Sequence, residues 1–141
     1  ADLPGLGARY SVALWFWLGE ASGASERSGT LVTGPGGESL GTRQFKDHRV
    51  QLALHGAHSS QARRADDWHF AVLVRDGDAV RVHWDGGEQP DLSTTLPAQP
   101  RGQRLVFGQG WQGKLDEIAV FDQALHVCFD LLHSSRTWLR L

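Results

Sequence analysis

Residues 65–87, ADDWHFAVLVRDGDAVRVHWDGG, contain two runs in which one set of apolar side chains recurs at every second position. A period of two is typical of a β-strand whose two faces meet different surroundings. The DGD segment between the runs, residues 76–78, offers a glycine for a positive φ, and this favours a tight turn. The stretch therefore predicts a β-hairpin with Trp68 and Trp84 at the ends of its strands.

The apolar pattern also predicts a register for this hairpin, because a slip of one residue would turn one apolar set to the wrong face. Matching the faces across a three-residue turn places Trp68 and Trp84 in the core. The predicted pairs are Val74 with Val80, Val72 with Val82, Phe70 with Trp84, and His69 with Asp85. A carboxylate beside an imidazole favours its charged form, so we expect the pKa of His69 to be raised.

Similar short runs recur along the chain, separated by glycine-rich turns, and predict an all-β fold. The apolar face of residues 10–18 runs from Tyr10 to Leu18, and residues 48–56 alternate in the same way. Further strands are expected at 30–33, 104–108 and 113–122, with a loop over 21–29 and at most a short edge strand within 85–103. The only helix that the sequence predicts covers 124–135, about three turns.

Length and charge limit the classes of function. The chain has 141 residues, the size of a single domain over 1–141. A net charge of −2 provides no basic field for nucleic acid, and no apolar run reaches the ~20 residues of a membrane-spanning helix. We therefore expect no nucleic-acid partner and no membrane insertion. The single cysteine excludes an internal disulfide, and the absence of methionine indicates a piece excised from a larger protein.

Three segments, in order, resemble laminin-G-like modules of the concanavalin A-like lectin/glucanase superfamily. Residues 66–86 resemble the W-H-x-V-A and V-x-V-Y-x-D-G segment of these modules, and residues 107–125 resemble G-x-I-D-E-V-x-I-Y-x-x-A-L. Residues 10–18 are similar to their early F-T-V-S-x-W strand. The resemblance implies an all-β jelly roll, two antiparallel sheets packed face to face, with one short C-terminal helix.

The sequence departs from the family pattern at both ends. These modules usually have a strand before the one at 10–18, and here that strand is missing, displaced or supplied by the tail TWLRL, residues 137–141. The usual acidic start of the C-terminal helix is replaced by residues 126–129, which removes the capping box. Phe129 points away from the apolar stripe of that helix, so we expect it to contact a neighbouring domain of the parent chain or a second copy.

Catalysis is not expected. Glycoside hydrolases of the superfamily need paired carboxylates ~5–9 Å apart, and no E-x-D-x-x-E arrangement occurs. Asp116 and Glu117 are neighbours that point to opposite faces of a strand. The pair of His69 and Asp85 could act as an oriented base, but a lock on the hairpin is the stronger interpretation.

Calcium is the candidate cofactor, because the resembled modules often hold it with loop carboxylates and backbone carbonyls. The candidate metal ligands are Asp85, Asp91 and Asp116, with Glu117 as a further oxygen donor. The alternative is that Asp116 caps backbone amides while Glu117 is solvated. Transition metals are not indicated, since the seven histidines show no H-x-x-x-H spacing.

A glycan is the expected partner, because aromatic faces stack on sugar rings while polar neighbours orient them. Trp15 and Trp17 share the face opposite the Tyr10–Leu18 stripe. The candidate ligand-binding residues are Trp15, Trp17, His55, Arg81 and His83, with Gln51 and Arg75 expected on the same face. Alternatively, the connection after residue 86 covers this face, or Trp15 belongs to a second small core.

These observations together predict a non-catalytic binding module that recognises a glycan. The alternatives are a protein-interaction or spacer module without sugar binding and, least favoured, a glycoside hydrolase. The resemblance alone implies an extracellular, periplasmic or cell-surface location.

Overall fold

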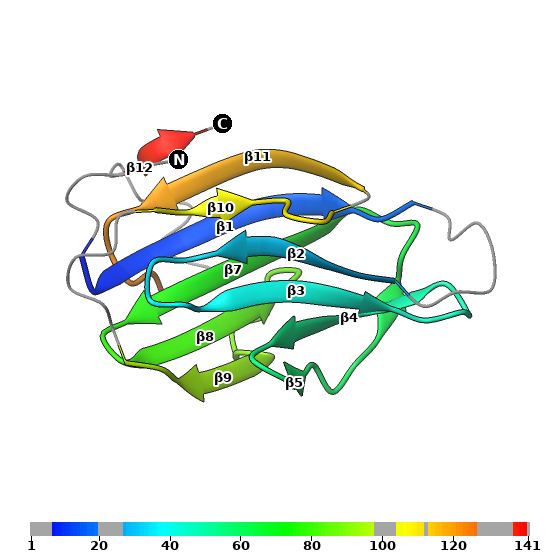
Figure 1. Cartoon of the computed structure of the whole chain (residues 1–141), viewed down its shortest axis with the longest axis horizontal. Coiled ribbons are helices and arrows are strands. Elements are labelled where there is room, and N and C mark those ends of the chain that lie inside the picture. The colour runs from blue at the N-terminus through cyan, green and yellow to red at the C-terminus, as the bar shows by residue number, and fades with distance from the viewer. Residues whose placement is uncertain (1–6, 20–26, 98–103, 112, 127–136, 141) are drawn as a thin grey trace.

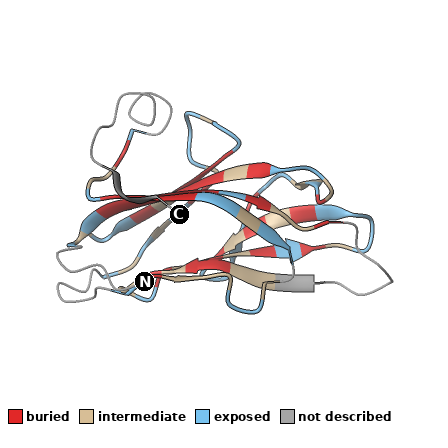
Figure 2. Ribbon diagram, turned by 90° about the horizontal axis from the view of Figure 1, so that it is seen from above, coloured by how far each residue is buried: buried red, intermediate tan, exposed pale blue. Residues whose placement is uncertain are grey.

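The computed structural model describes residues 7–19, 27–97, 104–111, 113–126 and 137–140, and in them the chain forms strands and turns. The strands are β1 (Arg9–Trp17), β2 (Arg27–Thr33), β3 (Ser39–Gln44), β4 (Arg49–Leu54), β5 (Ala57–His58), β6 (Arg63–Arg64), β7 (His69–Asp76), β8 (Ala79–Trp84), β9 (Leu92–Thr95), β10 (Val106–Phe107), β11 (Lys114–Phe121) and β12 (Thr137–Arg140). One sheet has the order β12-β11-β1-β7-β8-β9 and the other β10-β2-β3-β4-β5, with β6 paired to β4. The two sheets pack as two layers (Figures 1 and 2), which confirms the predicted all-β sandwich.

The main core lies between the sheets and contains the two predicted apolar stripes. From β1 it receives the side chains at positions 10, 12, 14 and 16, and from β4 those at 50, 52 and 54, all of them buried. Burial of an aliphatic or aromatic side chain of this size stabilises the fold by roughly 1.5–3 kcal/mol. The local alternation therefore placed the inner faces of β1 and β4 correctly.

The register of the β7–β8 hairpin differs from the predicted one. Asp76 pairs with Ala79 across a two-residue turn, in which Gly77 takes a φ of 63° at the first central position, as a type II′ turn requires. Ala71 consequently faces Trp84, and the inner face of β7 is the one predicted to lie outside. Trp68, expected in the core, is 44% exposed.

The physical reason for this error is that β7 is apolar on both faces. The side chains that face away from the main core enter a second apolar cluster on the outer side of the sheet, formed by Ala13, Val72, Val74, Ala119, Phe121 and Leu125. The Ser11 hydroxyl fixes the segment that covers the cluster, because it accepts from the Leu125 N–H at 3.0 Å and donates to the Gln123 carbonyl at 2.8 Å. A second small core thus exists, covered by residues 122–126, and Trp15 is not among its members.

Four further strands differ from the sequence-based expectations. β3 and the two short strands β5 and β6 were not predicted, and β2 begins at Arg27, inside the expected loop. At the other end of the chain, β12 pairs antiparallel with β11 at the edge of the sheet (Figure 1), so the tail supplies an edge strand. The predicted helix over 124–135 and Phe129 fall largely on residues 127–136, outside the described part of the chain, and stay predictions. Within the described residues, no helix has the length and apolar character needed to cross a bilayer.

One ion pair is buried between the sheets. Arg75, expected on the outer face, points inward, and its Nη2 lies 3.9 Å from Oε2 of Glu38, both side chains being at most 1% exposed. The same nitrogen donates to the Pro97 carbonyl at 2.9 Å. Burial raises the pKa of Glu38 although the charge of Arg75 acts in the opposite direction. Gly34 makes room for the carboxylate, because a Cβ there would lie 2.0 Å from Glu38 Oε1.

Candidate functional site

The ends of β7 and β8 are locked together by His69 and Asp85. Nδ1 of the His69 ring lies 2.8 Å from Oδ2 of Asp85, and Nε2 faces the carbonyl oxygen of Arg64. Both ring nitrogens thus face acceptors, which the doubly protonated imidazolium satisfies best. Burial of the ring opposes its charge, but the hydrogen bonds to Asp85 and Arg64 outweigh burial and raise the pKa of His69. The predicted pairing and the predicted direction of the pKa shift are both confirmed.

Asp85 reaches His69 from beyond the end of β8 rather than from the predicted cross-strand position. Its backbone has a φ of 54°, and its Oδ1 accepts the N–H of Phe70 at 2.8 Å. Arg63 adds an ion pair at 3.5 Å and stacks over the Trp84 ring at 4.9 Å. Burial would raise the pKa of Asp85, but the bonds from His69 and Phe70 lower it. Since protein acceptors occupy both nitrogens of His69, this arrangement serves as a lock on the hairpin.

The three predicted calcium ligands lie in separate local arrangements. Asp85 belongs to the lock, and Asp91 accepts the backbone N–H of Trp84 at 2.9 Å. Asp116 accepts the N–H of Glu117 at 2.8 Å, as the capping alternative proposed. Among the described residues, no group of three His, Cys, Asp or Glu side chains is placed to hold a metal ion. The calcium site therefore stays a prediction to which this part of the chain adds no support.

Three aromatic side chains gather on the outer side of the first sheet, where β1 ends and β7 begins, and a fourth, Trp68, lies just before β7. Trp15 pairs with Phe70 across the strands, with ring centroids 5.1 Å apart, and alternation puts Trp17 on the same face as Trp15. Trp68 comes two residues before Phe70 in the chain. Trp15 and Trp68 are the large apolar residues that the described chain leaves exposed, at 37% and 44%. We call Trp15, Trp17, Trp68 and Phe70 the aromatic face.

Polar groups border the aromatic face. The Lys114 ammonium lies 5.0 Å from the ring centroid of Trp17, whose indole N–H donates to the Asp66 carbonyl at 3.0 Å. Asp116 is the cross-strand neighbour of Trp15 on β11. The Trp17 ring is thus held in place and partly covered, whereas the rings of Trp15 and Trp68 are more open to solvent.

The other predicted ligand-binding residues do not join the aromatic face. Arg81 donates to the Leu125 carbonyl at 2.9 Å, beside the second cluster. His83 is buried, hydrogen-bonded to the Gly87 carbonyl at 2.9 Å, and its burial lowers its pKa. Gln51 and His55 lie on the second sheet. His55 separates from the tryptophans because alternation along one strand cannot show which sheet the strand joins. Arg81 and His83 do share the outer face of the first sheet, but their side chains are bonded to main-chain carbonyls away from the aromatic face.

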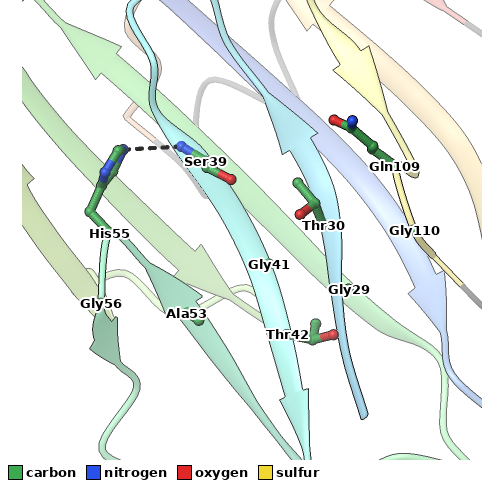
Figure 3. Close-up of a pocket in the computed structure, with 10 residues that line it drawn as sticks. All are labelled: Gly29, Thr30, Ser39, Gly41, Thr42, Ala53, His55, Gly56, Gln109 and Gly110. Atoms are coloured by element: carbon green, nitrogen blue, oxygen red, sulfur yellow. Dashed lines mark hydrogen bonds between the residues drawn. The ribbon is translucent and has the colours of Figure 1, made fainter.

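His55 instead borders a groove on the outer side of the second sheet, a feature that the sequence did not predict. The groove has a volume of about 430 Å³. Figure 3 shows the residues that line it: Gly29, Thr30, Ser39, Gly41, Thr42, Ala53, His55, Gly56, Gln109 and Gly110. Gly41 and Ala53 are cross-strand partners on β3 and β4, so small residues form its floor. The groove could not be predicted from the sequence because β3, which forms its centre, was not recognised as a strand.

Comparisons with known proteins agree with the fold. A family model, Laminin_G_3 of the concanavalin A-like lectin/glucanases superfamily, matches residues 1–128. Among curated proteins, none matches the sequence. Three solved structures have the same fold at low sequence identity. A candidate carbohydrate binding protein from Bacteroides ovatus ATCC 8483 has a TM-score of 0.66 at 11% identity, over 100% of this chain and 47% of that one.

The other two structures are a heptameric SAP-like pentraxin and a sialidase. The pentraxin, from Limulus polyphemus, has a TM-score of 0.55 at 13% identity, over 84% of this chain and 66% of its own. The sialidase, from Trypanosoma rangeli, has a TM-score of 0.57 at 16% identity, over 83% of this chain and 21% of its own. This chain thus spans about half of the Bacteroides protein and about a fifth of the sialidase.

Proposed function

The chain belongs to the Laminin_G_3 family of the concanavalin A-like lectin/glucanase superfamily, and from this premise we propose that it is a glycan-binding module. The observation that carries the proposal is the aromatic face, on which Trp15 and Trp68 are 37% and 44% exposed. A folded domain gains nothing for its own stability by leaving two indoles in water, whereas exposed indoles suit a ligand with apolar faces.

The chemistry of the aromatic face matches that of a sugar ring. One face of a pyranose ring presents C–H groups, which pack on indole, while its hydroxyls at the rim need hydrogen-bonding partners. Trp15 supplies an indole face beside the Phe70 ring, and Asp116 and Lys114 lie at the border, where hydroxyls would project. The protein described as a candidate carbohydrate binding protein has the same fold, which is compatible with this proposal.

The lock at the hairpin supports a non-catalytic role. His69, the histidine that pairs with Asp85, has both ring nitrogens bound to protein acceptors, so no lone pair remains for a substrate proton. A surface or extracellular location would suit a glycan-binding module, and family membership is the basis for proposing it.

A glycan array tests the proposal directly. The parent protein is compared with Trp15→Ala and Trp68→Ala, each with calcium and with a chelator, and Trp15→Phe is the matched control that keeps a ring to stack on. Loss of one stacking contact should weaken binding roughly 5- to 150-fold, by analogy with the ~1–3 kcal/mol measured for base–aromatic stacking. Unchanged binding in both alanine variants would refute the aromatic face as the site. Retention of a protein partner and of no glycan would favour the protein-interaction alternative.

A further inference from the structure

The groove on the second sheet is separate from the aromatic face, because the two lie on different sheets of the sandwich. We propose that it is a second binding site, which takes an uncharged polyhydroxyl ligand of one or two sugar residues. Its volume of about 430 Å³ falls within the ~300–1,000 Å³ of small-molecule sites. If the aromatic face binds glycan as proposed, a module with both sites bridges two glycan chains.

The floor of the groove is a row of three outward positions on neighbouring strands. Thr30 on β2 pairs with Gly41 on β3, and Gly41 pairs with Ala53 on β4. At Gly41 a Cβ would lie 2.6 Å from the Gly29 carbonyl oxygen, so the backbone leaves no space for a side chain at this position. The centre of the sheet therefore has almost no side-chain bulk, and a flat ring can approach the backbone.

His55 lies to one side of this row, beside Ser39, in a defined orientation. It forms, with Gly56, the two-residue turn between β4 and β5, and both residues have a positive φ, 48° and 81°, as a type I′ turn requires. The backbone N–H of Ser39 donates to its Nε2 at 3.2 Å (Figure 3). A neutral His55 ring must then carry its proton on Nδ1, and this N–H is a donor for a ligand.

The groove has the balance of polar groups that a neutral polyol needs. Its remaining polar side chains are hydroxyls and an amide, those of Thr30, Ser39 and Gln109, with the Thr42 hydroxyl buried beneath. Among the described residues that line it there is no Asp, Glu, Lys or Arg. A charged ligand would therefore lose its hydration without an opposite charge in return, whereas sugar hydroxyls can both donate to and accept from these groups.

The experiment uses ¹⁵N-labelled protein carrying Trp15→Ala and Trp68→Ala, so that the aromatic face is disabled. The probes are the methyl glycosides of glucose, galactose, mannose and N-acetylglucosamine, each titrated into the millimolar range. At least one probe should give saturable shifts at the amides of Thr30, Gly41 and Ala53. Thr30→Val, which keeps the side-chain shape, and His55→Asn, which keeps a residue suited to positive φ, should each weaken binding about 3- to 10-fold. Ala53→Leu should abolish binding by filling the floor.

The outcomes separate the two proposals. If none of the four glycosides shifts these amides, or if Ala53→Leu leaves the shifts unchanged, the groove proposal is wrong whatever the aromatic face does. If the groove binds while the tryptophan variants retain full array binding, the proposed function of the aromatic face fails and the groove stands. Bridging is measured as turbidity of galactomannan, xyloglucan and dextran solutions. It should appear with the parent protein for at least one of them and vanish when either site is disabled.

Discussion

Replacement of Asp85 by asparagine should lower the free energy of unfolding by about 2–3 kcal/mol, because it removes the charge that locks the β7–β8 hairpin. Asparagine tolerates the φ of 54° at this position, and its side-chain oxygen can still accept the Phe70 N–H. What is lost is the charge on the oxygen 2.8 Å from the His69 ring and 3.5 Å from Arg63.

The magnitude follows from the burial of the two partners. A hydrogen bond to a charged group contributes ~1.5–3 kcal/mol, and the His69 side chain is only 5% exposed. The Arg63 pair adds little, since the two side chains are 36% and 26% exposed and surface pairs contribute ~0–1 kcal/mol. Asp85→Ala should cost ~1–2 kcal/mol more than Asp85→Asn, because alanine is strained at positive φ.

The loss should depend on pH in a defined way. The pKa of His69 is raised above 6.5, so the stability that it contributes is fully present below pH 6.5 and is lost as the pH rises through the folded value. The pKa of Asp85 is lowered below 3.8, so its contribution is fully present above pH 3.8 and is lost as the pH falls through the folded value. The difference between parent and variant should therefore be largest between pH 3.8 and pH 6.5.

Urea unfolding at about pH 5 and about pH 9, with an NMR titration of His69, measures both effects. The matched control is Asp76→Asn at the other end of the hairpin, where Asp76 pairs with an Arg9 side chain that is 68% exposed. That change should cost less than about 1 kcal/mol. An equal loss for Asp85→Asn at the two pH values, or an unchanged His69 pKa in the variant, would show that the pair does not act as a charged lock.

Three further changes test the rest of the structure by chemical or thermal unfolding. Trp84→Ala should lower the free energy of unfolding by ~3–5 kcal/mol because Trp84 is 1% exposed, whereas Trp68→Ala should lower it by less than ~1 kcal/mol. Equal losses in the two variants would contradict the face assigned to β7. Glu38→Gln should lower the free energy of unfolding by ~3–5 kcal/mol, because it leaves Arg75 buried without its charge partner. Adding Arg75→Met should recover part of this loss. A double variant no more stable than Glu38→Gln alone would count against the ion pair. Gly34→Ala should cost ~1–3 kcal/mol because its Cβ would meet Glu38 Oε1 at 2.0 Å, and a melting temperature equal to that of the parent would show that the site has room.

The sequence by itself determined the features that depend on local alternation. The stripe that begins at Tyr10 predicted the inner face of β1, and the run from Val50 to Leu54 predicted that of β4. Each of these strands has one face markedly more apolar than the other, so only one orientation buries it. The contact between His69 and Asp85 was also predictable, because it lies within one hairpin and tolerates the shift in register.

The tertiary structure alone decided which of two apolar faces of β7 lies inside. Residues 122–126 cover the outer face of the sheet, so Val72 and Val74 are buried there and Leu73 can enter the main core. No pattern within β7 contains that information, because the covering segment is distant in the chain. The same holds for Arg75, which points inward because Glu38 meets it from the other sheet.

The candidate sites also depend on which strands become neighbours. Alternation shows that Trp15 and His55 each point away from the core, but only the strand order places them on different sheets. Phe70 lies beside Trp15 because the outer face of β7 is the one that the sequence predicted to be inside. Gly41 lies beside Ala53 because β3 pairs with β4. A binding surface is built from side chains on adjacent strands, and strand adjacency is set by contacts between residues far apart in the sequence, which a local period of two does not encode.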